Sequence, residues 1–267
     1  MFKRNGEGAT YLSRQYAEYP FHLCKLHYLD EAQPDMATLY LQSCSGGLFQ
    51  NDSLTVNVTA AARTCAHITS QASTIVHSSR GGQPAITKVT LTVEQDALLE
   101  YVPDPMILFP ESRLSSRIDL ILNPAAIVML TDAFITHDPE GKSRNPGRLD
   151  AVICVREHER FIVVDRLFVD GEYLCPGKPG VMGEWRCFGT FMILTRCIEA
   201  AQLSERLRVF LESCVQAYWG VSALPNDAGV LARFLSADAP SLRHAMEVAW
   251  RGARRITKGH DPSPRRK

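Results

Sequence analysis

The sequence predicts a predominantly β protein that carries two α-helices near its C-terminus. Residues 86–94 (ITKVTLTVE) alternate apolar and polar side chains, and the same period of two recurs at 118–122. Residues 151–169 have the pattern of a hairpin whose polar bend is EHER at 157–160. This alternation is typical of half-buried strands, and it gives way to a helical period near residue 196.

Two helices are expected beyond that point. The first is expected to run for about five turns and to end at a glycine C-cap, and the second begins after Asp238 with Pro240 in its first turn. Their apolar stripes comprise Leu207, Phe210, Leu211, Cys214 and Tyr218, with Gly220 as the cap, and Leu242, Ala245, Met246, Ala249 and Ala253.

Glycine-rich stretches mark two irregular places in the β region. At 43–58 (SCSGGLFQNDSLTVNV) a Gly-Gly pair allows positive φ or a close backbone approach, and Asn51 tolerates the left-handed region. We expect a double turn there, with Asp52 at its exit. Residues 171–189 (GEYLCPGKPGVMGEWRCFG) are expected to form a long irregular loop, and loops of that length are usually functional or disordered.

Composition excludes some classes of function. The 29 basic residues balance the 29 acidic residues, so no general electrostatic attraction to nucleic acid or to an anionic membrane is expected. The first 20 residues contain no apolar stretch of the kind found in signal peptides or membrane spans, and we expect a cytoplasmic protein. The eight cysteines form no CxxC pair, which indicates reduced and mostly buried thiols.

Catalytic motifs are absent from the sequence. It has no GxSxG elbow, no phosphate-binding GxxxxGK[ST], no GxGxxG and no HExxH. His67 and His77 flank a Thr- and Ser-rich strand, so a small cytosolic hydrolase that uses His77 and a neighbouring serine is one hypothesis. The other interpretation of these histidines is ordinary hydrogen bonding.

Acids inside apolar runs are the more unusual feature. Asp132 interrupts AIVMLTDAFI, and Asp165 interrupts FIVVDRLFV. A lone buried carboxylate costs several kcal/mol unless it is paired or wet. Each acid therefore either meets an Arg or backbone amides elsewhere, or lines a hydrated passage that suits a divalent cation in transit. Asp52, and the pair His137 and Asp138 just after Asp132, are further candidates for transient metal contact.

Several ordered blocks of sequence carry a family resemblance. They run from about Tyr19 to the end of the chain: YPFHLCK at 19–25, LYLQSCSGGLFQNDSLTV at 39–56, HITSQASTIVH at 67–77, LEYVPDPMILF at 99–109, YWGVSALPNDAGVLARFL at 218–235 and the closing RRK. In these blocks the chain resembles the urease accessory proteins of the UreD (also called UreH) family. The family usually has Gly in place of Asn51, and it commonly has Lys in place of Ile75.

The resemblance implies a non-enzymatic nickel-insertion chaperone. It implies a mainly β, β-helical single body with helices on one side, and it divides the chain into a flexible segment at 1–18, one UreD-like domain at 19–257 and a flexible basic tail at 258–267. Such a protein docks on the urease apoprotein. With the helical accessory protein UreF and the GTPase UreG, it delivers Ni²⁺ to the urease active site.

The resemblance also implies an internal nickel tunnel lined partly by acids, and the family's acidic positions fall on Asp52, Asp132 and Asp165. Nickel is then expected in transit, with no cofactor bound stably and no nucleic acid or membrane partner. Besides the hydrolase, one further hypothesis stays open: a purely structural adaptor that binds partners without touching metal.

Overall fold

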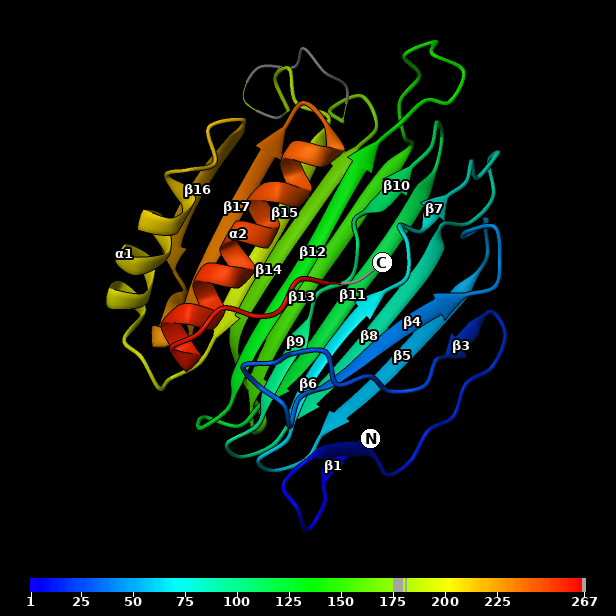
Figure 1. Ribbon diagram of the computed structural model, residues 1–267. Coiled ribbons are helices and arrows are strands. Elements are labelled where there is room, and N and C mark those ends of the chain that lie inside the picture. The colour runs from blue at the N-terminus through cyan, green and yellow to red at the C-terminus, as the bar shows by residue number, and fades with distance from the viewer. Residues whose placement is uncertain (175–179, 181, 266–267) are drawn as a thin grey trace.

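The computed structural model describes residues 1–174, 180 and 182–265 of the chain. Its strands form two sheets, and two helices lie side by side along one part of the second sheet (Figure 1). Sheet A has the strand order β14 (Arg160–Asp170), β13 (Arg148–Glu157), β11 (Arg113–Leu122), β8 (Ala85–Val93), β5 (Ser53–Ala60), β1 (Phe2–Arg4) and β2 (Thr10–Leu12). Sheet B has the order β16 (Ala217–Ala223), β17 (Gly229–Ser236), β15 (Cys187–Leu194), β12 (Ile127–Thr136), β9 (Leu98–Tyr101), β6 (Cys65–Ser70), β4 (Ala37–Ser43) and β3 (Phe21–Leu23). The short β10 (Met106–Leu108) pairs with β12, and the short β7 (Ile75–Val76) pairs with β10.

The chain builds the two sheets as a solenoid. From β4 to β13 it crosses between them, so that β4, β6, β9 and β12 pair in parallel in sheet B while β5, β8, β11 and β13 pair in parallel in sheet A. The mainly β, β-helical fold expected from the sequence is therefore confirmed. The hairpin at 151–169 is confirmed as well, because β13 and β14 pair antiparallel around a bend in which His158 has φ of 53°.

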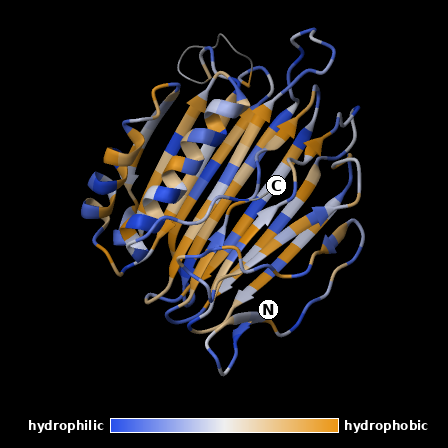
Figure 2. Cartoon of the chain, in the orientation of Figure 1, coloured by the Kyte–Doolittle hydropathy of each residue, from blue (hydrophilic) through white to orange (hydrophobic). Residues whose placement is uncertain are grey.

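The main core lies between the two sheets. Alternate residues of each strand point inward, and side chains of sheet A such as Leu120 and Val155 form one cluster with side chains of sheet B such as Leu130 and Met192. A second core lies between sheet B and the helices. The hydrophobic residues concentrate along the strands, whereas hydrophilic and hydrophobic residues alternate along α2 (Figure 2). Burial on both faces explains why β12 is apolar throughout most of its length.

The second predicted helix is confirmed. α2 (Ala239–Lys258) begins after Asp238, whose carboxylate accepts a hydrogen bond from the backbone N–H of Ser241 at 2.8 Å. It ends at Gly259, which adopts the left-handed conformation with φ of 84°. α2 packs across β12, β15 and β17.

The extent predicted for the first helix is wrong. α1 (Ala200–Leu211) ends three residues before Cys214, and both Tyr218 and Gly220 belong to β16. Pairing with β17 over the whole length of β16 outweighs the helical spacing of these residues. A short 3-10 turn, η1 (Pro225–Asp227), joins β16 to β17.

The segments at both ends of the chain lie against the β body. In the stretch expected to be flexible at 1–18, β1 pairs with β2 and with β5. In the expected tail at 258–267, Lys258 still belongs to α2, and the Arg265 guanidinium lies 3.3 Å from the carbonyl oxygen of Val102 in sheet B. The loop expected at 171–189 gives way to β15 at Cys187, and its residues 175–179 and 181 lie outside the described part.

Candidate functional site

The double turn after β4 has the geometry that its sequence indicates. Asn51 has φ of 68° and Gly47 has φ of 131°, and a Cβ on Gly47 would lie 2.4 Å from the carbonyl oxygen of Ile75. The Asp52 carboxylate accepts a hydrogen bond from the Phe49 backbone N–H at 2.8 Å. Asp52 thus closes the turn, two residues before Leu54, which lines an internal cavity.

Asp132 lies on the inner face of sheet B. In the sheet register it pairs with Thr190 of β15, which pairs in turn with Arg233 of β17, so the three side chains share one face. Leu130 and Met192, one pair along the same face, belong to the core between the sheets. Asp132 and Arg233 therefore both project into the interior of the solenoid.

Asp165 faces Asp132 from the opposite sheet. It pairs with Ile153 of β13, and Ile153 belongs to the core between the sheets, so the Asp165 carboxylate points inward from sheet A. That carboxylate accepts a hydrogen bond from Arg233 Nη2. Of the two situations that the sequence left open, Asp165 has the Arg partner, supplied by the other sheet.

Asp132 has a different environment. Within the described residues its carboxylate has neither a hydrogen-bond donor nor a cationic partner. Burial, and then the negative charge of Asp165, raise its pKa from 3.8 to about 7. Burial and the charge of Asp132 in turn raise the pKa of Tyr101 above its ordinary value of 10. The two acids are thus electrostatically coupled, and at neutral pH Asp132 holds its proton part of the time.

Two cavities are lined by members of this inner row of sheet B. The Asp132 cavity, of about 280 Å³, is lined by Asp132 together with Leu54, Thr87 and Tyr101. The Arg233 cavity, of about 360 Å³, is lined by Arg233, Phe134 and Leu167 among others. Within the Asp132 cavity, the hydroxyl of Thr87 is buried without a partner among the described residues, which makes this a polar lining. Asp132 thus lines the more polar cavity, and Arg233 lines the more apolar one.

His137 and Asp138 are not brought to this interior. His137 is exposed, and Asp138 organises the loop that follows β12, where it binds Arg144 at 2.9 Å and accepts backbone hydrogen bonds. The hydrogen bond from Arg144 lowers the pKa of Asp138. In the described part of the chain, no group of three or more His, Cys, Asp or Glu side chains has the arrangement of a metal site.

His77 makes contacts that differ from those of a catalytic pair. Its Nε2 lies 3.0 Å from the carbonyl oxygen of Gly46, to which it donates, and its ring stacks on Phe49 at 4.3 Å between centroids. The hydroxyl of the adjacent Ser78 donates to Glu111 rather than to the imidazole. His77 thus fastens the double turn to β7.

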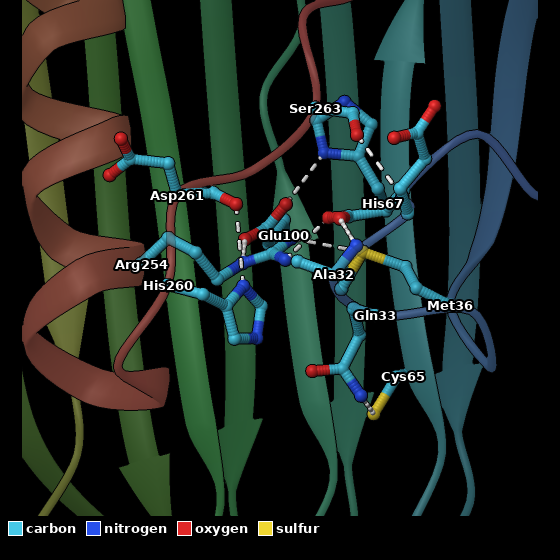
Figure 3. Close-up of polar contacts among 12 residues, drawn as sticks. Ala32, Gln33, Met36, Cys65, His67, Glu100, Arg254, His260, Asp261 and Ser263 are labelled. Carbon is cyan, nitrogen blue, oxygen red and sulfur yellow. Dashed lines mark hydrogen bonds and ion pairs between the residues drawn. The ribbon is translucent and has the colours of Figure 1, made fainter.

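A buried charge network was missed by the sequence analysis (Figure 3). Arg254 of α2 is fully buried, and its guanidinium binds Glu100 at 2.7 Å and Asp30 at 2.6 Å. His67 Nδ1 lies 2.7 Å from the other Glu100 oxygen. Burial alone would raise the pKa of Glu100, but the His67 hydrogen bond and the Arg254 charge lower it to about 2. The signal in the sequence was an arginine beside the apolar stripe of α2.

The described helices set one further bound on the class of protein. Among the residues that the structure describes, none of the helices is both long and apolar enough to cross a membrane. The fold and the site together define a β-solenoid with an acid-containing interior and helices along one sheet.

Comparison with known proteins assigns the family. The family model described as UreD urease accessory protein matches residues 1–267. The chain is 42% identical over 267 residues to a protein named Urease accessory protein UreD 1 from Pseudomonas syringae pv. syringae (strain B728a), covering 100% of this chain and 93% of that protein. It is 38% identical over 270 residues to the protein of that name from Methylorubrum extorquens (strain PA1), covering 100% and 90%. The chain belongs to the UreD urease accessory protein family.

Proposed function

We propose that this protein is a cytoplasmic, non-enzymatic scaffold that binds the urease apoprotein and conducts Ni²⁺ toward the urease active site. Its partners in this proposal are the helical accessory protein UreF and the GTPase UreG. The observation that carries the proposal is the pair Asp132 and Asp165, which point inward from opposite sheets, with Asp132 in the lining of a cavity. Carboxylate oxygens in a wet interior suit a divalent cation that keeps part of its water.

Weak, transient nickel contact follows from the same geometry. A conduit must release the ion that it takes up, and within the described residues no compact set of His, Cys, Asp and Glu is present. Asp132 offers a carboxylate without a fixed partner, while Asp165 already has one in Arg233. Asp52 precedes Leu54, a residue of the Asp132 cavity lining, by two positions, and its carboxylate accepts a hydrogen bond from the Phe49 backbone N–H. No cofactor is expected to remain bound after dialysis.

The partner surface in this proposal includes the exposed apolar residues after β15. Val209, Val215 and Tyr218 are 67%, 87% and 68% exposed, although they belong to the segment that packs α1 against β16. Exposed apolar patches commonly mark an interface, and these three side chains are proposed to contribute to one. The loop at 171–189 borders the same end of the Arg233 cavity through Leu174 and Met182.

The deciding experiment replaces both inner acids with asparagine. Asp132→Asn/Asp165→Asn keeps side-chain volume and hydrogen-bonding capacity but removes the negative charge that attracts the cation. We expect the variant to fold and to be recovered with the urease subunits and UreF in a pull-down. Activation of urease in the presence of nickel should fall at least about tenfold, which corresponds to 1.4 kcal/mol.

The matched control is Asp150→Asn. Asp150 also lies on sheet A and pairs with an arginine, Arg166, but on the outer face. The control should activate urease at the wild-type rate. Full activation by the double variant would instead favour a structural adaptor without metal contact, and loss of complex formation would remove the acids from any conduit role.

A further inference from the structure

Arg233 places a permanent positive charge inside the passage proposed for a cation. Its position opposite Thr190, in the same row as Asp132, directs it to the inner face of sheet B. Its guanidinium donates to Asp165 of sheet A, so this ion pair spans the gap between the two sheets. A fixed cation at that point repels an arriving Ni²⁺ and occupies one of the two carboxylates that would receive it.

Two members of the inner row of sheet B line different cavities. Arg233 lines the Arg233 cavity, whereas Asp132 lines the Asp132 cavity. Phe134, the next inward residue after Asp132 on β12, already belongs to the lining of the Arg233 cavity. Asp132 and Arg233 thus face different cavities from the same face of sheet B, and Asp165 of sheet A is held by Arg233.

We propose that Arg233 is an internal cation plug that holds Asp165 while no metal is present and that Ni²⁺ displaces when it reaches the two inner acids. This inference rests on the proposed function, because it gives a gate to the same passage. In the closed state the guanidinium neutralises Asp165. In the open state the metal takes over that carboxylate with Asp132, and the guanidinium moves away.

The guanidinium of Arg233 has a second contact besides Asp165. Its Cζ lies 5.6 Å from the centroid of the Phe188 ring, within the range of a cation–π interaction. The Arg233 side chain is 38% exposed, and the cavity beside it has about 360 Å³ of free volume. A guanidinium that releases Asp165 would thus still have an aromatic ring and solvent beside it.

The test measures nickel binding by the full-length protein in equilibrium dialysis against NiCl₂. Arg233→Gln removes the charge and leaves a side chain that can still hydrogen-bond. Because a unit charge a few ångströms away interacts by several kcal/mol at an effective dielectric constant near 20, we expect nickel to bind at least about tenfold more tightly. In an Asp165→Asn background, Arg233 no longer has a carboxylate to hold. There, Arg233→Gln should raise nickel affinity by only about twofold.

The matched control is Arg148→Gln. Arg148 pairs with Asp170 at 2.9 Å and lies 5.3 Å from the Phe168 ring, which is the same arrangement on the outer face of the solenoid. It should leave nickel affinity unchanged. Arg233→Lys is the second variant: it keeps the charge that folding needs but replaces the two-pronged donor with one ammonium group, and about threefold tighter binding is expected.

Unchanged nickel affinity in both Arg233 variants overturns the plug, even if their melting temperatures fall, because that result assigns Arg233 only to the stability of the fold. The proposed function is tested separately by urease activation with Asp132→Asn/Asp165→Asn. If that variant fails to activate urease while the Arg233 variants bind nickel like the wild type, the conduit stands and the plug does not. If it activates urease fully, the passage itself is wrong.

Discussion

Arg254→Met should destabilise the protein more than any exposed substitution on the same helix. Methionine keeps much of the length of arginine, but it leaves the carboxylates of Glu100 and Asp30 without their shared cation in a site where Arg254 and Glu100 are fully buried. Breaking a buried pair by removing one partner costs about 3 to 5 kcal/mol. The His67 hydrogen bond and the Arg254 charge together lower the Glu100 pKa from 4.5 to about 2, which corresponds to about 3 kcal/mol shared between the two partners.

Urea unfolding followed by tryptophan fluorescence measures this loss, because Trp250 lies beside His67 with 5.2 Å between ring centroids. Arg251→Met is the control on the same helix: Arg251 is half exposed, its contact with Asp261 is 3.6 Å long, and a change below about 1 kcal/mol is expected. A loss below about 1.5 kcal/mol for Arg254→Met would refute the role given to the network.

The pH dependence of that difference follows from the sign of the Glu100 shift. A carboxyl group whose pKa is depressed in the folded state stabilises the fold above its unfolded pKa, and this contribution fades as pH falls through the folded value. The gap in unfolding free energy between wild type and Arg254→Met should therefore be full at pH 6 and should narrow between about pH 4.5 and pH 2. Equal gaps at pH 6 and pH 3 would contradict the assignment.

Two further outcomes are expected. Gly47→Ala should cost about 1 to 3 kcal/mol of stability, because the new Cβ meets the Ile75 carbonyl oxygen at a position with positive φ. Gly46→Ala has open space around the new Cβ and should cost less than about 0.5 kcal/mol, as a typical surface substitution does. Thermal melts of the two variants compare these losses directly. Asp132→Asn should stabilise the protein by up to about 4 kcal/mol at pH 8 and by almost nothing at pH 4. The reason is that the pKa of Asp132 is raised to about 7 in the folded state, so its ionisation opposes folding as the pH rises. A gain in stability that does not change with pH would contradict that pKa.

The parts of the fold with local signals were predictable from the sequence. α2 carries its boundaries in its own residues, with an acid at the N-cap, a proline in the first turn and a left-handed glycine after the last turn. The strands of the solenoid show the period of two that comes from burying one face. The first helix failed because Cys214 and Tyr218 continue its apolar spacing, while the alternation of β16 only acquires its meaning beside β17.

The candidate site was predictable in its acids but not in their partners. Asp132 and Asp165 stand out in the sequence because each interrupts an apolar run, and this signal is local. The cation that holds Asp165 lies 68 residues away on another sheet, and no period or spacing indicates it. The same holds for Arg254, which meets Glu100 and Asp30 across 154 and 224 residues. Such pairings depend on tertiary arrangement, which one sequence does not encode in any short pattern.

The network around Arg254 has a consequence for local opening of the folded protein. Its members come from the segment before β4, from β6, from β9 and from α2, so lifting the helix would expose two carboxylates, Asp30 and Glu100, on two separate stretches of chain at once. Excursions of α2 should therefore be rare and all-or-none, with its amide protons exchanging at the same slow rate as those of β6 and β9. The edge formed by α1 and β16 contributes no member to this network, so its amide protons should exchange independently of α2, and Tyr218 and Trp219 of this edge line the Arg233 cavity.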